Sequence, residues 1–254
     1  MRYYRLFLIA VVFFAACSTL KQVENLPEKA ESAYQSGDME EALIVYEELI
    51  SQSESDMEMA EPIYYKRAGL AAYALGENRK ALQHLDRLRH TDVGDEETHH
   101  TLALLYREID NLSREITHLS EYAQQYPEGD EIEYVRIRLF ETLVESRNFQ
   151  EAYDMWKSLP SDKTADESLM VQWFQLHQEL EKTDALPDLA EDLLNINPLN
   201  REALDFLARK HFRAAESLYN AEMQAYEANR TNKQYAQLLE ALEVVNTNLH
   251  IALD

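Results

Sequence analysis

The sequence is poor in the residues that interrupt regular backbone structure, with only 5 glycines and 6 prolines among 254 residues. It also lacks Asn-Gly pairs and long β-branched runs, which are the usual signals of β-hairpins and strands. Leu, Glu and Ala are the commonest residues instead, and these residues lose little on entering a helix. The composition therefore predicts an all-α chain, which is long enough to bury a sizeable core as one long domain or two ordinary ones.

Basic side chains are also few, since 24 Lys and Arg against 47 Asp and Glu give a net charge of −23. Phosphate binding needs a clustered basic surface, so we expect no nucleic-acid partner. The single cysteine, Cys17, excludes a disulfide framework and a zinc ribbon. Walker loops, Gly-x-Ser-x-Gly motifs and a cysteine nucleophile are missing too, and we therefore expect no enzyme, no cofactor and no small-molecule substrate.

The N-terminus has the layout of a secretory signal peptide. Arg2 and Arg5 precede an apolar stretch at residues 6–16, which is too short for a bilayer span of about 20 residues. The end of this stretch and the residue after it read FAAC, residues 14–17, in which the last residue is Cys17. We therefore assign residues 1–16 to a signal peptide that does not belong to the fold.

The two alanines before Cys17 resemble the bacterial lipobox, although Phe14 stands where leucine is usual. The resemblance implies that Cys17 is lipidated and becomes the mature N-terminus, followed by a linker over residues 17–22. Several acyl chains on one residue anchor a protein stably. Ser18, rather than aspartate, implies the outer membrane, with the protein facing the periplasm. The alternative is an ordinary cleaved signal with an unrelated cysteine.

A helix-turn-helix pattern repeats after the linker. Its turns are expected at Gly37-Asp38, Gly76-Glu77, Asp110-Asn111 and Arg147-Asn148, and near Thr183-Asp184. The equivalent positions Ala42, Ala81, Glu115, Ala152 and Leu186 follow at spacings of 39, 34, 37 and 34 residues. These spacings cluster at the period of about 34 expected for helix-turn-helix repeats, and such pairs must stack because one pair cannot bury its own apolar face.

The first two copies resemble the tetratricopeptide repeat (TPR) family. The matching residues are Ala30, Tyr34, Gly37-Asp38, Ala42 and Tyr46 in the first copy, and Ala68-Gly69, Tyr73, Gly76 and Ala81 in the second. The later copies keep the period but carry Glu115 and Leu186 where alanine is usual. The resemblance implies a right-handed α-solenoid of about five TPR-like helix pairs over residues 23–199. Small residues such as Gly69 and Ala81 would let paired helices approach closely.

The C-terminal segment, residues 200–254, departs from this period. Apolar residues recur at three- and four-residue spacings from Leu204 to Tyr226 and again from Tyr235 to Leu249, with NRTN at 229–232 between them. This pattern predicts a longer C-terminal helical hairpin that caps the solenoid. No stop signal precedes Asp254, so we expect that part of the last helix is missing from this chain.

Several histidines lie close to acidic residues in the sequence, as metal ligands often do. His99 and His100 are adjacent and point about 100° apart on a helix, so they cannot share one ion without distortion. His100 with Glu96, and His177 with Glu181, lie four residues apart, but each pair lacks the further ligands that zinc needs. We therefore interpret these residues as solvated helix positions and expect no metal site.

The remaining feature is a binding surface. In the TPR family the first helices line a groove that holds partners, and counting from the turns places eight candidates there: Tyr34, Lys66, Leu70, Tyr73, His100, Arg107, Ile137 and Glu141. The alternative is that these residues only solvate the groove or pack between repeats.

The resemblance thus favours a lipid-anchored scaffold or adaptor that binds other envelope proteins or peptides. The alternative function is a component of an outer-membrane β-barrel assembly complex. That complex contains a TPR lipoprotein of similar size, but the long terminal hairpin of this chain departs from the pattern of that lipoprotein family. A pull-down from solubilised membranes would separate the two, because a single barrel-assembly partner supports the second and varied partners support the first.

Overall fold

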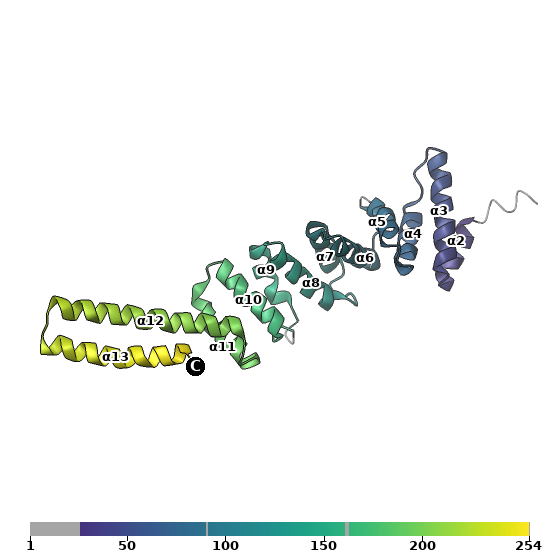
Figure 1. Ribbon diagram of the computed structural model, residues 1–254. Coiled ribbons are helices and arrows are strands. Elements are labelled where there is room, and N and C mark those ends of the chain that lie inside the picture. Colours follow the sequence, from purple (N-terminus) through teal and green to yellow (C-terminus); the bar gives the residue numbers. More distant parts are fainter. Residues whose placement is uncertain (1–25, 90, 161–162, 254) are drawn as a thin grey trace, which may run out of the picture. The chain divides into compact units, whose positions relative to one another are not determined.

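The computed structural model describes residues 26–89, 91–160 and 163–253, and all regular secondary structure in these ranges is helical (Figure 1). The expected signal peptide, Cys17 and the linker lie outside the described residues. Among the helices that are described, none has both the length and the apolar character needed to cross a bilayer. The chain divides into two compact units, Met1–Thr142 and Leu143–Asp254.

The first unit is built from consecutive helix pairs. These are α2 (Leu26–Ser36) with α3 (Met39–Ser55), α4 (Pro62–Ala74) with α5 (Asn78–Leu85), and α6 (Glu96–Glu108) with α7 (Leu112–Gln125). A 3₁₀ turn, η1 (Asp86–Leu88), extends α5, and α8 (Ile132–Glu145) begins in this unit. Helices α2 to α6 each pack on the next one in sequence, and α4 also contacts α6. This nearest-neighbour packing is the pattern of a repeat array.

The turns inside the helix pairs all close in the same way. The amide of Gly37 donates to the carbonyl of Tyr34 at 3.1 Å, and that of Asp38 donates to Ala33 at 3.0 Å. The same two bonds recur at Gly76-Glu77, Asp110-Asn111, Arg147-Asn148 and Glu181-Lys182. The first residue of each turn has φ between 53° and 81°, so every turn is a Schellman closure with one left-handed residue.

Four of these turns lie where the sequence predicts them. The fifth turn, expected near Thr183-Asp184, lies two residues earlier at Glu181-Lys182, because η3 (Thr183–Ala185) is already helical and leads directly into α11. The left-handed residues of the five turns, from Gly37 to Glu181, follow one another at spacings of 39, 34, 37 and 34 residues. The equivalent positions from Ala42 to Leu186 have the same spacings in the sequence. The predicted all-α array of TPR-like helix pairs is therefore confirmed.

Small residues bring the helices of the second pair together, as predicted. Ala42 and Ala81 are fully buried at equivalent positions of their repeats. At Gly69 of α4, a Cβ atom would lie 2.5 Å from Cγ of Leu85 and 3.3 Å from the carbonyl oxygen of Ala81. No larger residue fits there unless the Leu85 side chain moves, so Gly69 permits the close approach of the two helices.

The second unit contains α9 (Phe149–Met155), η2 (Trp156–Ser158), α10 (Glu167–Glu179) and α11 (Leu186–Ile196). Its core is centred on Phe174 and Leu193, which are both fully buried. The rings of Trp156 and Trp173 stack at a centroid distance of 4.5 Å. These contacts link η2, α10 and α11 into one packed layer.

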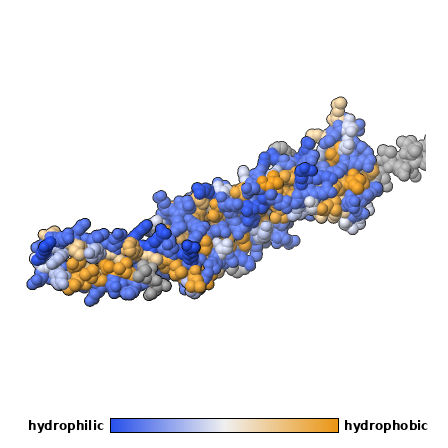
Figure 2. All heavy atoms as spheres, in the orientation of Figure 1, coloured by the Kyte–Doolittle hydropathy of each residue, from blue (hydrophilic) through white to orange (hydrophobic). Residues whose placement is uncertain are grey.

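The predicted C-terminal hairpin is present in this unit. It consists of α12 (Arg201–Ala228) and α13 (Asn232–Leu253), which lie side by side over most of their length (Figure 1). Apolar side chains remain on its surface, such as Tyr235 at 51% and Leu239 at 47% exposure, and Figure 2 shows orange patches along these helices. The hairpin therefore buries only part of the apolar pattern that predicted it.

Candidate functional site

Two of the eight predicted groove residues are buried. Leu70 is 4% exposed and belongs to the core of the first unit, and Lys66 is 8% exposed. The ammonium group of Lys66 forms an ion pair with Asp95, which caps α6 by accepting from the amide of Thr98 at 3.1 Å. The prediction that Lys66 and Leu70 face a groove is wrong, because this side of α4 packs against α6 and the segment before it.

Two further groove candidates, Tyr34 and Tyr73, are half-buried and pack against the core of the first unit. The guanidinium of Arg67 lies 4.3 Å from the centre of the Tyr34 ring and 3.2 Å from a carboxylate oxygen of Glu31. Burial raises the pKa of the Tyr34 hydroxyl. Both tyrosines keep some exposed surface, so their docking role stays a prediction.

Arg107 is another residue predicted to face the groove. Its Nη1 atom lies 3.6 Å from Oε2 of Glu115, across the turn of its own repeat. Glu115 is only 1% exposed, and its Oε1 accepts hydrogen bonds from Arg138 Nε at 2.8 Å and from the Thr142 hydroxyl at 3.1 Å. Arg107 is therefore paired inside its own repeat, and its role in a groove stays a prediction.

The last three groove candidates are half-buried. His100 packs edge-on against Tyr134 with ring centroids 5.7 Å apart, and Glu141 accepts a hydrogen bond from Arg138 Nη1 at 3.0 Å. Ile137 lies on the same helix, α8, as Glu141. Most of the predicted groove residues therefore make contacts within the first unit, and their remaining surface is small.

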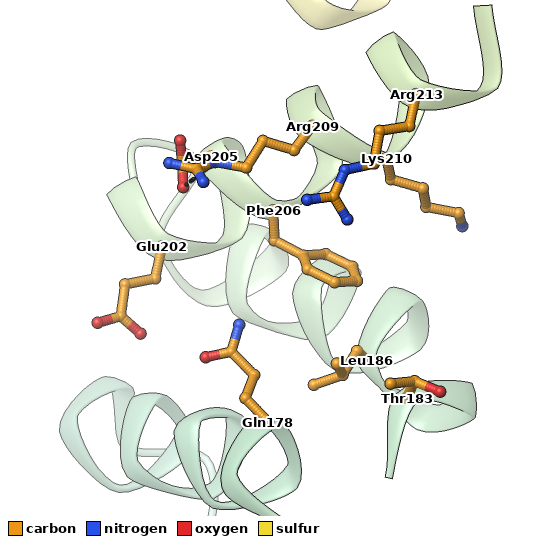
Figure 3. Close-up of a pocket in the computed structure, with 9 residues that line it drawn as sticks. All are labelled: Gln178, Thr183, Leu186, Glu202, Asp205, Phe206, Arg209, Lys210 and Arg213. Carbon is orange, nitrogen blue, oxygen red and sulfur yellow. Dashed lines mark ion pairs between the residues drawn. The ribbon is translucent and has the colours of Figure 1, made fainter. Parts of the chain in front are cut away.

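A more open site lies in the second unit, where a pocket of about 690 Å³ is formed by α10, η3, α11 and α12 (Figure 3). Its lining residues are Gln178, Thr183, Leu186, Glu202, Asp205, Phe206, Arg209, Lys210 and Arg213. In Figure 3 Phe206 points into the pocket, with Leu186 on one side of its ring and the basic side chains on the other. The pocket thus joins an apolar wall to a positively charged rim.

The basic rim comes from one face of α12. Arg209 and Arg213 are four residues apart, and Lys210 adjoins the same stripe, so the three side chains project to one side. Arg209 pairs with Asp205 at 2.9 Å. Lys210 and Arg213 are exposed and make no ion pair within the described part of the chain. Sequence reasoning missed this stripe, although three basic residues within five positions stand out in so acidic a chain.

The opposite end of the pocket carries an acceptor. Glu202 accepts a hydrogen bond from the Gln175 side-chain amide through Oε1 at 2.5 Å. Its Oε2 atom is buried and has no hydrogen-bond partner among the described residues. A buried acceptor without a partner costs free energy, which a donor from a bound ligand would recover.

A second cluster of polar groups lies between α6 and α7. The Nδ1 atoms of His99 and His118 are 3.4 Å apart, and Glu121 Oε2 is 3.1 Å from the first and 3.5 Å from the second. Burial lowers the pKa of His99, and burial together with His99 lowers the pKa of His118 to about 4. The His118 Nε2 atom is buried without a partner among the described residues. These three groups could hold a metal ion.

This cluster was missed because His99 was paired only with its sequence neighbours. His118 and Glu121 are three residues apart and share one face of α7. The helices of one repeat run back along each other from the Asp110 turn, so residues at similar distances from that turn come together. His99 and His118 lie 11 and 8 residues from Asp110, a signal that was present in the sequence.

Neither a protein-family model nor a curated protein matches this sequence. Among solved structures it is similar to YrrB, described as a TPR protein with an unusual peptide-binding site, at 12% identity, over 69% of this chain and 86% of that one, with a TM-score of 0.49. It is also similar to MamA, at 17% identity, over 75% of this chain and 95% of that one, with a TM-score of 0.42. At such values the fold assignment rests on this chain's own helix pairs and turns.

Proposed function

We propose that this protein is a lipid-anchored component of the bacterial envelope that works as a protein-interaction scaffold. The lipobox resemblance at Cys17 supports the anchor, and the array of helix pairs supports the scaffold. The observation that carries the proposal is the pocket on α12, because it combines exposed positive charge with an apolar wall in a chain of net charge −23.

The shape of the site favours a peptide segment as the occupant. The lining residues of α12 run from Glu202 to Arg213, which corresponds to about 16 Å along a helix. An extended peptide rises about 3.3 Å per residue, so roughly five residues would cover this length. A stripe of that length suits a segment of another protein better than a compact small molecule.

The chemistry of the site defines the segment further. Lys210 and Arg213 would pair with carboxylates, the latter in bidentate geometry. Phe206 and Leu186 would contact an apolar side chain, and a peptide N–H would donate to the unpartnered oxygen of Glu202. The partner is therefore a segment of an envelope protein that carries acidic residues beside a large apolar one.

The test is direct binding of fluorescent peptides to the intact protein, measured by anisotropy. Peptides of about six residues that combine Asp or Glu with Leu or Phe should bind, and peptides with Lys in place of the acidic residues should not. Lys210→Glu with Arg213→Glu should weaken binding about thirtyfold or more, because losing a charged anchor typically costs about 2 kcal/mol.

The matched control is Arg230→Glu with Lys233→Glu. It reverses two exposed charges at the turn of the same hairpin, away from the residues that line the pocket. The control should bind as the unmodified protein does. Equal weakening by both double variants would show that net charge alone drives binding, and no weakening by either would exclude the pocket as the docking site.

A further inference from the structure

We propose that His99, His118 and Glu121 form a zinc site that clips α6 to α7 in the third helix pair. Two imidazole nitrogens and one carboxylate oxygen are a ligand set that zinc commonly takes. The three ligand atoms face one another from two helices, with His99 on α6 and the other two residues on α7. The proposal concerns the first unit only and does not depend on the peptide site.

The distances between the ligand atoms fit a tetrahedral ion. Zinc binds imidazole nitrogen and carboxylate oxygen at about 2.0–2.1 Å, so two ligands of one tetrahedron lie about 3.3–3.4 Å apart. The three separations here are 3.4, 3.1 and 3.5 Å. One ion can therefore reach all three atoms with shifts of a few tenths of an ångström, and its fourth position is left for water.

Packing holds the ligands in this arrangement. The His118 ring stacks on Tyr106 with an interplanar angle of 6° and a centroid distance of 5.5 Å. The ring of His99 lies between His118 and Tyr126, at centroid distances of 5.6 and 6.4 Å. The two imidazole side chains are only 13% and 7% exposed, whereas Glu121 is 44% exposed. The two imidazole rings are thus held in place by packing, and an ion from solvent can reach the site on the side of the exposed Glu121 carboxylate.

Hydrogen bonding alone would explain the contact between His99 and Glu121, since 3.1 Å is an ordinary distance for such a bond. Hydrogen bonding explains the position of His118 less well. The two Nδ1 atoms are 3.4 Å apart, which is long for a hydrogen bond, yet both face the same carboxylate oxygen. A cation bound by all three atoms accounts for that convergence.

The experiment uses the full chain in detergent, stripped of metal with a chelator and titrated with zinc chloride by calorimetry. The unmodified protein should bind one equivalent saturably, and zinc should raise its melting temperature. Glu121→Gln and His99→Gln should each lower the zinc affinity at least tenfold, because each removes one ligand. Cobalt(II) should give the visible absorption of a tetrahedral site in the unmodified protein and lose it in both variants.

The matched controls are His100→Gln and Glu97→Gln, which remove a histidine and a carboxylate from α6 without touching the three ligands. Both should bind zinc as the unmodified protein does. Binding that is equally tight in Glu121→Gln would assign the metal to the acidic surface or to Cys17 and overturn the proposal, as would a lack of saturable binding. If His99→Gln fails to fold, the partly exposed Glu121→Gln decides alone.

Discussion

At the level of single residues, Glu115 shows how a departure from a repeat pattern is accommodated. It occupies the position of Ala42 and Ala81 and is buried like them. A buried carboxylate is tolerated only where hydrogen bonds and opposite charges compensate its lost hydration. Here Arg138 and Thr142 of α8 supply the hydrogen bonds. An alanine-type helix contact is thus replaced by a polar link between α7 and α8.

This arrangement predicts that restoring the common residue will destabilise the protein. Glu115→Ala should cost about 1–3 kcal/mol, because it leaves Nε of the largely buried Arg138 without its acceptor, while Glu141 still accepts from Nη1. A pattern-based expectation gives the opposite sign, since consensus substitutions usually stabilise. The measurement is the urea midpoint of unfolding, followed by circular dichroism.

The control for this prediction is the double variant Glu115→Ala with Arg138→Leu. Replacing a buried ion pair by apolar residues is often neutral or stabilising, so the double variant should recover most of the loss. A Glu115→Ala variant as stable as the unmodified protein would show that the pair contributes nothing.

At the level of helices, the turns were the most predictable feature. Gly37 and Gly76 mark left-handed residues that glycine adopts without strain, and the period carried the assignment on to Asp110 and Arg147. The fifth turn could be placed only to within a few residues, because Glu181 gives no turn signal in the sequence. The left-handed conformation there is imposed by the two backbone bonds of the closure, which the amino-acid type does not reveal.

Gly69 gives a prediction for the packing of α4 on α5. In a free helix, glycine to alanine stabilises by about 1 kcal/mol. Here the new methyl group would meet Cγ of the buried Leu85 at 2.5 Å, so Gly69→Ala should instead destabilise by about 1–3 kcal/mol. Thermal unfolding of the purified Gly69→Ala variant and the unmodified protein would measure this loss of stability.

A double-mutant cycle with Leu85→Ala tests the cause of this effect. Leu85→Ala removes the atoms that the new methyl group would meet. Gly69→Ala should be far less harmful in that background, and the difference is the coupling between the two positions. Equal effects in both backgrounds would mean that the two helices do not touch at Gly69.

At the level of the whole molecule, the candidate site was less predictable than the fold. Helix propensity and periodicity are local, so they located the pairs and the hairpin. The pocket instead requires Leu186 of α11 to meet Glu202 and Arg213 of α12. The burial of Lys66 and Leu70 likewise depends on contacts between repeats, which counting from a turn cannot show. Tertiary packing therefore determines which side chains of a helix remain exposed for contact with a partner.

The anchor gives a prediction for the complete protein. If Cys17 is lipidated, Cys17→Ser should move the protein from the membrane fraction to the soluble fraction, since no described helix can hold it in a bilayer. Ser18→Ala changes the neighbouring residue and leaves the thiol in place, so it should remain in the membrane fraction. Immunoblotting of separated membranes measures both. A Cys17→Ser protein that stays membrane-bound, at the same level as Ser18→Ala, would contradict lipidation and leave the ordinary signal peptide as the better account of residues 1–16.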